Sequence, residues 1–258
     1  MAVIGIDLGT TNSLAGVWQD GKVVLIPNAF GEYLTPSVVS IGKNQEVFVG
    51  SVAKEMLATQ PYDTFREFKR NMGTNFLYGN GRKKYRAEEL SAFVLRRLKE
   101  DAEKFLGEEV TEAVISVPAY FDDNKRNATK NAGRLAGLKV ERLINEPSAV
   151  ALKHHTAEKG AESFIVFDFG GGTLDVSLVE AFDNVVEIQA VAGDNYLGGK
   201  DFNEIIAQDF YEQNQISEAY LTKNEQENVL KEAEAVKKEL TDKNEAERQV
   251  YIKGEAIR

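Results

Sequence analysis

Short apolar runs separated by Gly and Asp turns open the chain. Such runs predict β-strands, and the first five are residues 3–6, 14–17, 23–26, 38–41 and 47–49. Between residues 87 and 106 the apolar positions recur at spacings of three and four. This spacing predicts an amphipathic helix, and Gly107 provides its stop.

Strands and helices alternate in the middle of the chain. Residues 113–117 predict a buried strand, and a helix over 123–136 follows with Gly137 as its left-handed cap. Residues 140–144 predict another strand and residues 148–154 a short helix. This alternation favours an α/β fold in which helices cover the sheets.

A second set of strands begins after residue 160. The predicted strands are residues 164–167, 174–179 and 185–192. Two helices follow, over residues 199–214 and 222–241. Large aromatic side chains usually lie inside, so Trp18 and the Phe residues are expected in the core.

One short pattern occurs twice. Ile6-Asp7-Leu8-Gly9-Thr10 near the start is similar to Phe167-Asp168-Phe169-Gly170-Gly171-Gly172-Thr173 in the second half. Each copy follows an apolar strand and precedes another. The repeat predicts two lobes of the same basic design, with a cleft that brings both turns to one ligand.

The two turns carry the chemistry of a phosphate site. Gly residues leave backbone N–H groups unobstructed, and such groups bind anions. An Asp beside a phosphate is repulsive unless a cation such as hydrated Mg²⁺ stands between them. Each turn alone also fits an ordinary hairpin. No P-loop is present, since in Gly193–Lys200 the Lys comes one place late.

Composition narrows the classes of function. The 258 residues carry 31 basic and 41 acidic side chains, a net charge of -10, which argues against nucleic-acid binding. Cysteine is absent, which excludes thiolate metal sites and thiol catalysis. No signal peptide and no long apolar run is evident, so we expect no membrane contact and a cytoplasmic location.

Five ordered motifs make the chain resemble the heat-shock-protein-70 (Hsp70) family from residue 2 to about residue 241. They lie at residues 6–13, 117–121, 144–149, 166–176 and 192–199. The first of them reads Ile6-Asp7-Leu8-Gly9-Thr10-Thr11-Asn12-Ser13. A further segment, Phe30 to Ser37, is similar to the HscC branch of the DnaK-like proteins.

The resemblance implies an actin-like ATPase fold: two ribonuclease-H-like lobes with inserted subdomains and ATP in the cleft. Lobe I is expected over 1–160 and lobe II over 161–258, with a core at 161–197 and a smaller subdomain from about 198. The family's domain is longer than this chain. We therefore expect lobe II to be incomplete and ATP binding to be much weaker than in a completed domain, or absent.

The resemblance also implies a set of site residues. The catalytic group is expected to be Lys69, Glu146, Thr173 and Asp175, with Asp7 and Asp168 holding Mg²⁺ through water. K⁺ is a second candidate ion. The residues expected to bind the phosphates and ribose are Gly9, Thr10, Thr11, Asn12, Gly170, Gly171, Gly172, Thr173, Gly198 and Gly199.

The late helix carries the expected adenosine site. Glu234, Lys237, Lys238 and Thr241 lie at spacings of three and four and share one face. In the family this face binds ribose and adenine, although Arg is usual where this chain has Lys238. An alternative is an ordinary salt-bridged helix surface.

The function implied is the ATP-binding and ATP-hydrolysing module of a chaperone. Its nucleotide state would control peptide binding by a further domain, with Pro118 and Arg126 coupling the two. A J-domain co-chaperone, a nucleotide-exchange factor and unfolded peptide are the expected partners. An actin-like filament protein and a small-metabolite kinase are the alternatives, and Lys69 with residues 144–147 favours the chaperone.

Overall fold

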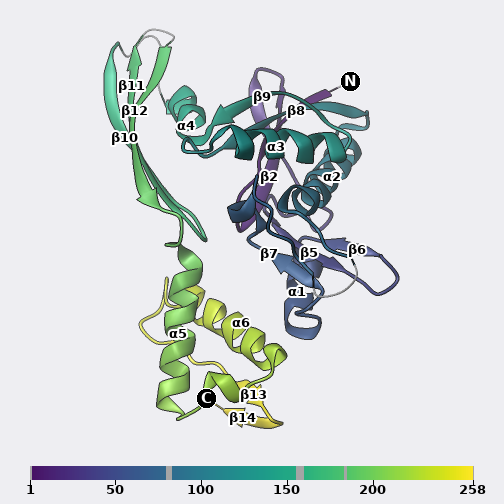
Figure 1. The fold of residues 1–258 in the computed structure, drawn as a ribbon. Helices are drawn as coiled ribbons and strands as arrows, with labels where there is room; N and C mark the ends of the chain where they lie inside the picture. Colours follow the sequence, from purple (N-terminus) through teal and green to yellow (C-terminus); the bar gives the residue numbers. More distant parts are fainter. Residues whose placement is uncertain (1, 80–82, 155–159, 183–184, 258) are drawn as a thin grey trace.

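The computed structural model describes residues 2–79, 83–154, 160–182 and 185–257 (Figure 1). Its largest sheet runs in the order β3-β2-β1-β8-β9, and β4 pairs with β2. The first three strands are antiparallel, whereas β8 and β9 continue the sheet parallel to β1. The strands are β1 (Ala2–Asp7), β2 (Asn12–Gln19), β3 (Lys22–Ile26), β4 (Thr35–Pro36), β8 (Val110–Val117) and β9 (Lys139–Asn145).

Two helices cover this sheet. α2 (Ala87–Leu106) and α3 (Asp123–Leu135) lie side by side across it in Figure 1. Their apolar faces pack with alternate sheet residues into one core that includes Ile4, Ile115 and Leu90. The left-handed glycines predicted to stop the two helices, Gly107 and Gly137, both have positive φ.

A smaller sheet, ordered β6-β5-β7, adjoins the large one. It is formed by β5 (Val38–Ile41), β6 (Val47–Val49) and β7 (Thr64–Arg66), and it packs against α1 (Ser51–Thr59). A short 3₁₀ helix, η1 (Phe68–Asn71), follows and is packed against α2. This segment matters for function because η1 carries Lys69.

The second half starts with the same strand arrangement as the first. β10 (Glu162–Phe169), β11 (Leu174–Phe182) and β12 (Val185–Asp194) form an antiparallel sheet in that order, as β1, β2 and β3 do. α4 (Glu146–His154) packs against β11 and β12. The short pattern that occurs twice in the sequence therefore belongs to a three-stranded unit that occurs twice in the structure.

A separate helical unit with its own small core follows β12. It contains α5 (Gly199–Gln213), η3 (Glu218–Tyr220), α6 (Lys223–Glu239), β13 (Val250–Ile252) and β14 (Glu255–Ile257). Thr222 caps α6, since its hydroxyl accepts a hydrogen bond from the Glu225 N–H at 3.3 Å. The helix ends at Glu239, so the prediction that it reaches Thr241 was two residues too long.

The prediction that Trp18 lies in the core is wrong. Its side chain is 70% exposed, and it pairs with exposed Val23 on the face of β2 and β3 turned away from the core. The Phe residues divide: Phe68 and Phe121 are buried, whereas Phe167 is 66% exposed. Among the described residues, no helix combines the length and apolar character needed to cross a membrane.

Candidate functional site

The two glycine turns, residues 8–11 and 170–173, are in contact. A methyl group placed on Gly171 would overlap the Thr11 hydroxyl, and one on Gly172 would lie 3.3 Å from Thr10 Cγ2. Each turn joins two antiparallel strands, β1 to β2 and β10 to β11. The fold thus brings together two segments that lie about 160 residues apart in the sequence.

Close packing explains why these positions are glycine. A side chain on Gly9 would overlap the Asn12 carbonyl, and one on Gly198 would overlap the backbone of Gly172. The loop that starts α5 lies on the second turn, because the Gly199 N–H donates to the Gly170 carbonyl at 3.0 Å. A side chain at either position would therefore force these backbone segments apart.

A buried ion pair lies beside the turns. Lys69 Nζ is 2.9 Å from Glu146 Oε1, and the two side chains are only 9% and 17% exposed. Lys69 comes from η1 and Glu146 from the first residue of α4. Burial raises the pKa of Glu146, and the negative charges of Asp7 and Asp168 raise it further. The nearby Lys69 ammonium lowers this pKa in part.

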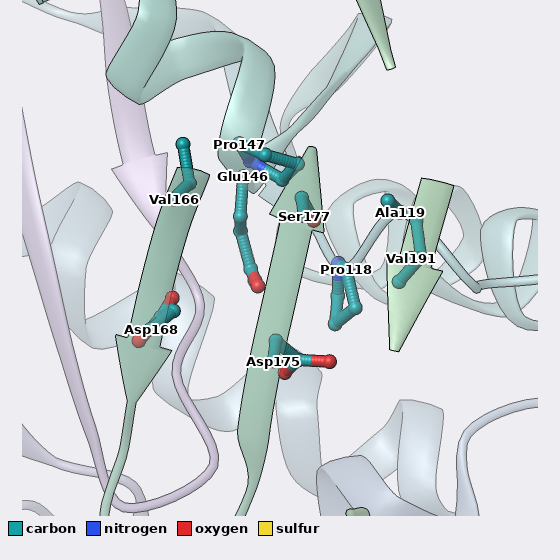
Figure 2. A pocket seen from close by; sticks show the side chains of 9 residues that line it. All are labelled: Pro118, Ala119, Glu146, Pro147, Val166, Asp168, Asp175, Ser177 and Val191. Atoms are coloured by element: carbon teal, nitrogen blue, oxygen red, sulfur yellow. The ribbon is translucent and has the colours of Figure 1, made fainter. Parts of the chain in front are cut away.

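Further carboxylates surround that pair. Figure 2 shows Glu146, Asp168 and Asp175 lining one small pocket. Asp168 and Asp175 are directly opposite in the register of β10 and β11. Asp7, at the end of β1, accepts a hydrogen bond from the Ser116 hydroxyl at 2.8 Å.

This group of acids carries excess negative charge. Burial raises the pKa of Asp168, and the Asp7 charge raises it further. Burial raises the pKa of Asp175 to about 6, with contributions from Glu146 and Asp168. The single positive charge of Lys69 does not balance four carboxylates, so a bound cation would be electrostatically favourable here. In the described part of the chain, no three metal-binding side chains are grouped closely enough to ligate one directly. Water-mediated binding of Mg²⁺ fits this donor set.

The raised pKa of Asp175 predicts a pH dependence of stability. The pKa of an Asp in an unfolded chain is about 3.9, and the pKa of Asp175 in the folded protein is about 6. Between these two pH values the folded state therefore binds more protons than the unfolded state. The contribution of Asp175 to stability therefore falls as pH rises from about 4 to about 6. We expect Asp175→Asn to stabilise the protein at pH 7 and to do so less at pH 4.5. Urea unfolding of both proteins at the two pH values measures this; an equal effect at both values would contradict it.

The face of α6 predicted to bind adenosine lies close to α1 and to the start of α5. Glu234 accepts from Lys54 of α1 at 2.8 Å and from Lys238 at 2.7 Å. Burial would raise the pKa of Glu234, but these two hydrogen bonds lower it to about 2. Lys237 donates to the Gly199 carbonyl. Lys238 is two-thirds exposed, and Thr241 is exposed just beyond the end of the helix.

Four contacts made by Glu67 and Arg70 have no counterpart among the sequence predictions. Glu67 accepts from Arg70 at 3.0 Å and from Lys200 at 2.8 Å. Arg70 also donates to the Gly172 carbonyl and lies over the Tyr196 ring. The only sequence signal for a role of Arg70 is its position next to Lys69. Gly172, Tyr196 and Lys200 come from distant parts of the chain, whereas Glu67 is three residues from Arg70.

The two residues predicted to couple the site to a further domain lie close to it. Pro118 ends β8, is buried and lines the pocket. Arg126 of α3 donates to the Phe121 carbonyl at 2.8 Å and to the Asn145 side chain at 2.7 Å. Asn145 immediately precedes Glu146. Arg126 is therefore bonded to the residue that precedes Glu146 of the buried ion pair.

The comparison with known families gives a clear result. The model of the family described as Hsp70 protein matches residues 3–81 and 77–256. The chain belongs to the Hsp70 family. Its fold is accordingly the mixed α/β, actin-like ATPase fold predicted from the sequence. Membership of this family indicates that the chain is a chaperone module of the ATPase type. Proteins of the family generally bind nucleotide with a divalent metal and interact with co-chaperones.

Proposed function

We propose that this Hsp70 chain binds ATP with Mg²⁺ at its two glycine turns, which would move apart to admit the nucleotide, and hydrolyses it to ADP and phosphate. The observation that carries the proposal is the contact between the turns, with the buried Lys69–Glu146 pair beside them. Glycine turns leave backbone N–H groups unobstructed by side chains, which suits a polyphosphate. A fixed cation with nearby acids suits a hydrolytic water.

Each glycine turn has a part in phosphate binding. Thr10, Thr11 and Asn12 would contact the outer phosphates from lobe I. Gly170, Gly171, Gly172 and Thr173 would hold the β- and γ-phosphates from lobe II. Gly9 permits the tight first turn, and Gly198 and Gly199 would lie near the ribose and inner phosphates.

The buried charges would prepare the reaction. Bound Mg²⁺ would neutralise phosphate charge, with Asp7 and Asp168 holding its water shell; K⁺ is a further candidate ion. Lys69 would bind the γ-phosphate oxygen and, with Glu146, orient the attacking water. Asp175 and Thr173 complete the group around that water. Phosphoryl transfer requires this positioning and charge neutralisation more than covalent catalysis.

The adenosine would lie along α6. Glu234 and Lys237 would bind the ribose hydroxyls, Lys238 would cover the adenine, and Thr241 would lie at the edge. Glu234 is already fixed by Lys54 of the other lobe, so a ribose placed here would contact a rigid carboxylate.

Lys238→Arg should strengthen nucleotide binding. A planar guanidinium stacks on an aromatic base, whereas an ammonium group does not. The gain expected is a few-fold, about 0.5–1 kcal/mol for an exposed cation on a ring. Calorimetry with ADP measures it, and Lys231→Arg on the same helix is the control. Equal affinity of Lys238→Arg and the unaltered chain would place the adenine elsewhere.

Control of peptide binding by nucleotide is the wider role we infer. Pro118 and Arg126 would report the state of the site, since Arg126 is bonded next to Glu146. A J-domain co-chaperone, a nucleotide-exchange factor and unfolded peptide bound by another domain are the partners proposed. A cytoplasmic location remains a prediction.

The proposal is tested by ATP titration in a calorimeter with Mg²⁺ and with EDTA, alongside a phosphate-release assay. We expect Mg²⁺-dependent binding and slow release of phosphate. Nucleotide-dependent pelleting would instead indicate a filament protein, and phosphate transfer to a small metabolite would indicate a kinase. If ATP bound neither with Mg²⁺ nor with EDTA, the proposal would be refuted.

A further inference from the structure

The first glycine turn is supported from behind by one buried serine. Ser37 lies between β4 and β5 and is 2% exposed. Its hydroxyl donates to the Gly9 carbonyl at 2.8 Å, and its backbone N–H donates to the Thr11 carbonyl, also at 2.8 Å. A single residue therefore bonds two alternate carbonyls of the turn.

The direction of these bonds bears on ligand binding. A loop that binds phosphate must present its N–H groups to the anion and turn its carbonyls away, because a carbonyl oxygen repels it. Ser37 holds two carbonyls on the side of β4 and β5. It thereby keeps the turn in the orientation that anion binding requires.

The serine is itself fixed. Its hydroxyl already donates to Gly9, so the Ser13 hydroxyl, 2.8 Å away and 1% exposed, must donate to it. Ser13 is on β2, which pairs with β4 at Ser13 and Thr35. The hydroxyl pair thus joins the strand after the turn to the segment behind it, where no water is available to replace either bond.

The position of Thr11 gives this support a functional consequence. Its side chain touches Gly171 of the second turn. If the Thr11 carbonyl shifted, the contact between the turns would shift with it. The bond to Thr11 comes from the Ser37 backbone N–H and is kept in a Ser37→Ala variant. The hydroxyl acts on the turn through the Gly9 carbonyl, two residues before Thr11.

We propose that Ser37 is a positioning residue for the phosphate-binding turn. It is not expected to contact the nucleotide; it sets the orientation of the turn that does. The idea rests on the proposed function, because a turn that binds no phosphate needs no such orientation. Its consequence is selective: loss of the hydroxyl weakens the binding of phosphates and leaves the binding of adenosine unchanged.

Ser37→Ala and the matched variant Ser40→Ala separate this role from a general effect on folding. Ser40 is also buried, is three residues away, and its hydroxyl accepts from Thr64 at 2.9 Å, but it is not bonded to the turn. Affinities for ATP with Mg²⁺ and for adenosine are measured by calorimetry. We expect Ser37→Ala to bind ATP about tenfold more weakly with unchanged adenosine affinity, the scale of one buried hydrogen bond, and Ser40→Ala to change neither.

Equal losses for ATP and adenosine in Ser37→Ala, or equal behaviour of the two variants, would overturn the inference. Hydrogen exchange of residues 8–13 without nucleotide provides a second measurement. Exchange faster in Ser37→Ala than in Ser40→Ala supports the positioning role even if the unaltered chain binds no ATP, which would refute only the proposed function. Equal exchange in the two variants counts against Ser37.

Discussion

Lys69→Ala should lose ATP turnover by about 100- to 1,000-fold, the range measured for removal of one preorganised donor to a transition state. The reason is the position of Lys69 Nζ, held 2.9 Å from Glu146 beside both glycine turns. Most ATP contacts come from the turns themselves, so affinity should change little. Single-turnover phosphate release and calorimetric affinity separate the two quantities.

A cost in stability must be separated from the loss of chemistry. Removing Lys69 leaves Glu146 buried without its partner, which costs about 3–5 kcal/mol. The double variant Lys69→Ala/Glu146→Gln removes that charge, so we expect it to regain stability and not turnover. Lys130→Ala, on the exposed side of α3, is the surface control. Normal turnover in Lys69→Ala would remove Lys69 from the mechanism.

Asp168→Asn should weaken the dependence of ATP binding on Mg²⁺. Asp168 lies on β10 just before the second glycine turn, and the charge of Asp7 acts on it. A carboxylate placed here would repel a bound phosphate unless a cation intervenes. Without its charge, ATP should bind better in EDTA and worse with Mg²⁺. We expect the ratio of the two affinities to fall by about tenfold, equivalent to roughly 1.4 kcal/mol.

The matched variant for this experiment is Asp209→Asn. Asp209 is an exposed residue of α5, where it accepts from Gln213 at 2.7 Å. It has the same charge and lies outside the site, so its ratio should equal that of the unaltered chain. If Asp168→Asn retained the full Mg²⁺ dependence, Asp168 would have no part in holding the metal.

The fold was predictable because its signals are local. The apolar runs and the positive-φ glycines that stop α2 and α3 mark their elements directly. The repeated Asp-x-Gly pattern predicted the internal repeat, since each copy joins two strands in the same way. The family resemblance then led to Lys69. Lysine is usually found at the surface, whereas the structure buries this one.

What sequence could not provide depends on contacts between distant segments. Glu67 and Lys200 form an ion pair across 133 positions, and neither belongs to a motif. Ser37 is important through the carbonyls it bonds, a relation that no spacing reveals. Trp18 was misplaced because strand alternation shows which residues share a face but not which face a helix covers.

Hydrogen exchange with and without Mg²⁺ and ATP tests the central claim most directly. If one nucleotide is bound between the two turns, both residues 7–13 and residues 168–174 should exchange more slowly with Mg²⁺ and ATP. Adenosine alone should protect neither segment and should slow exchange only near Glu234. Protection of a single turn by ATP, or of neither, would contradict the account.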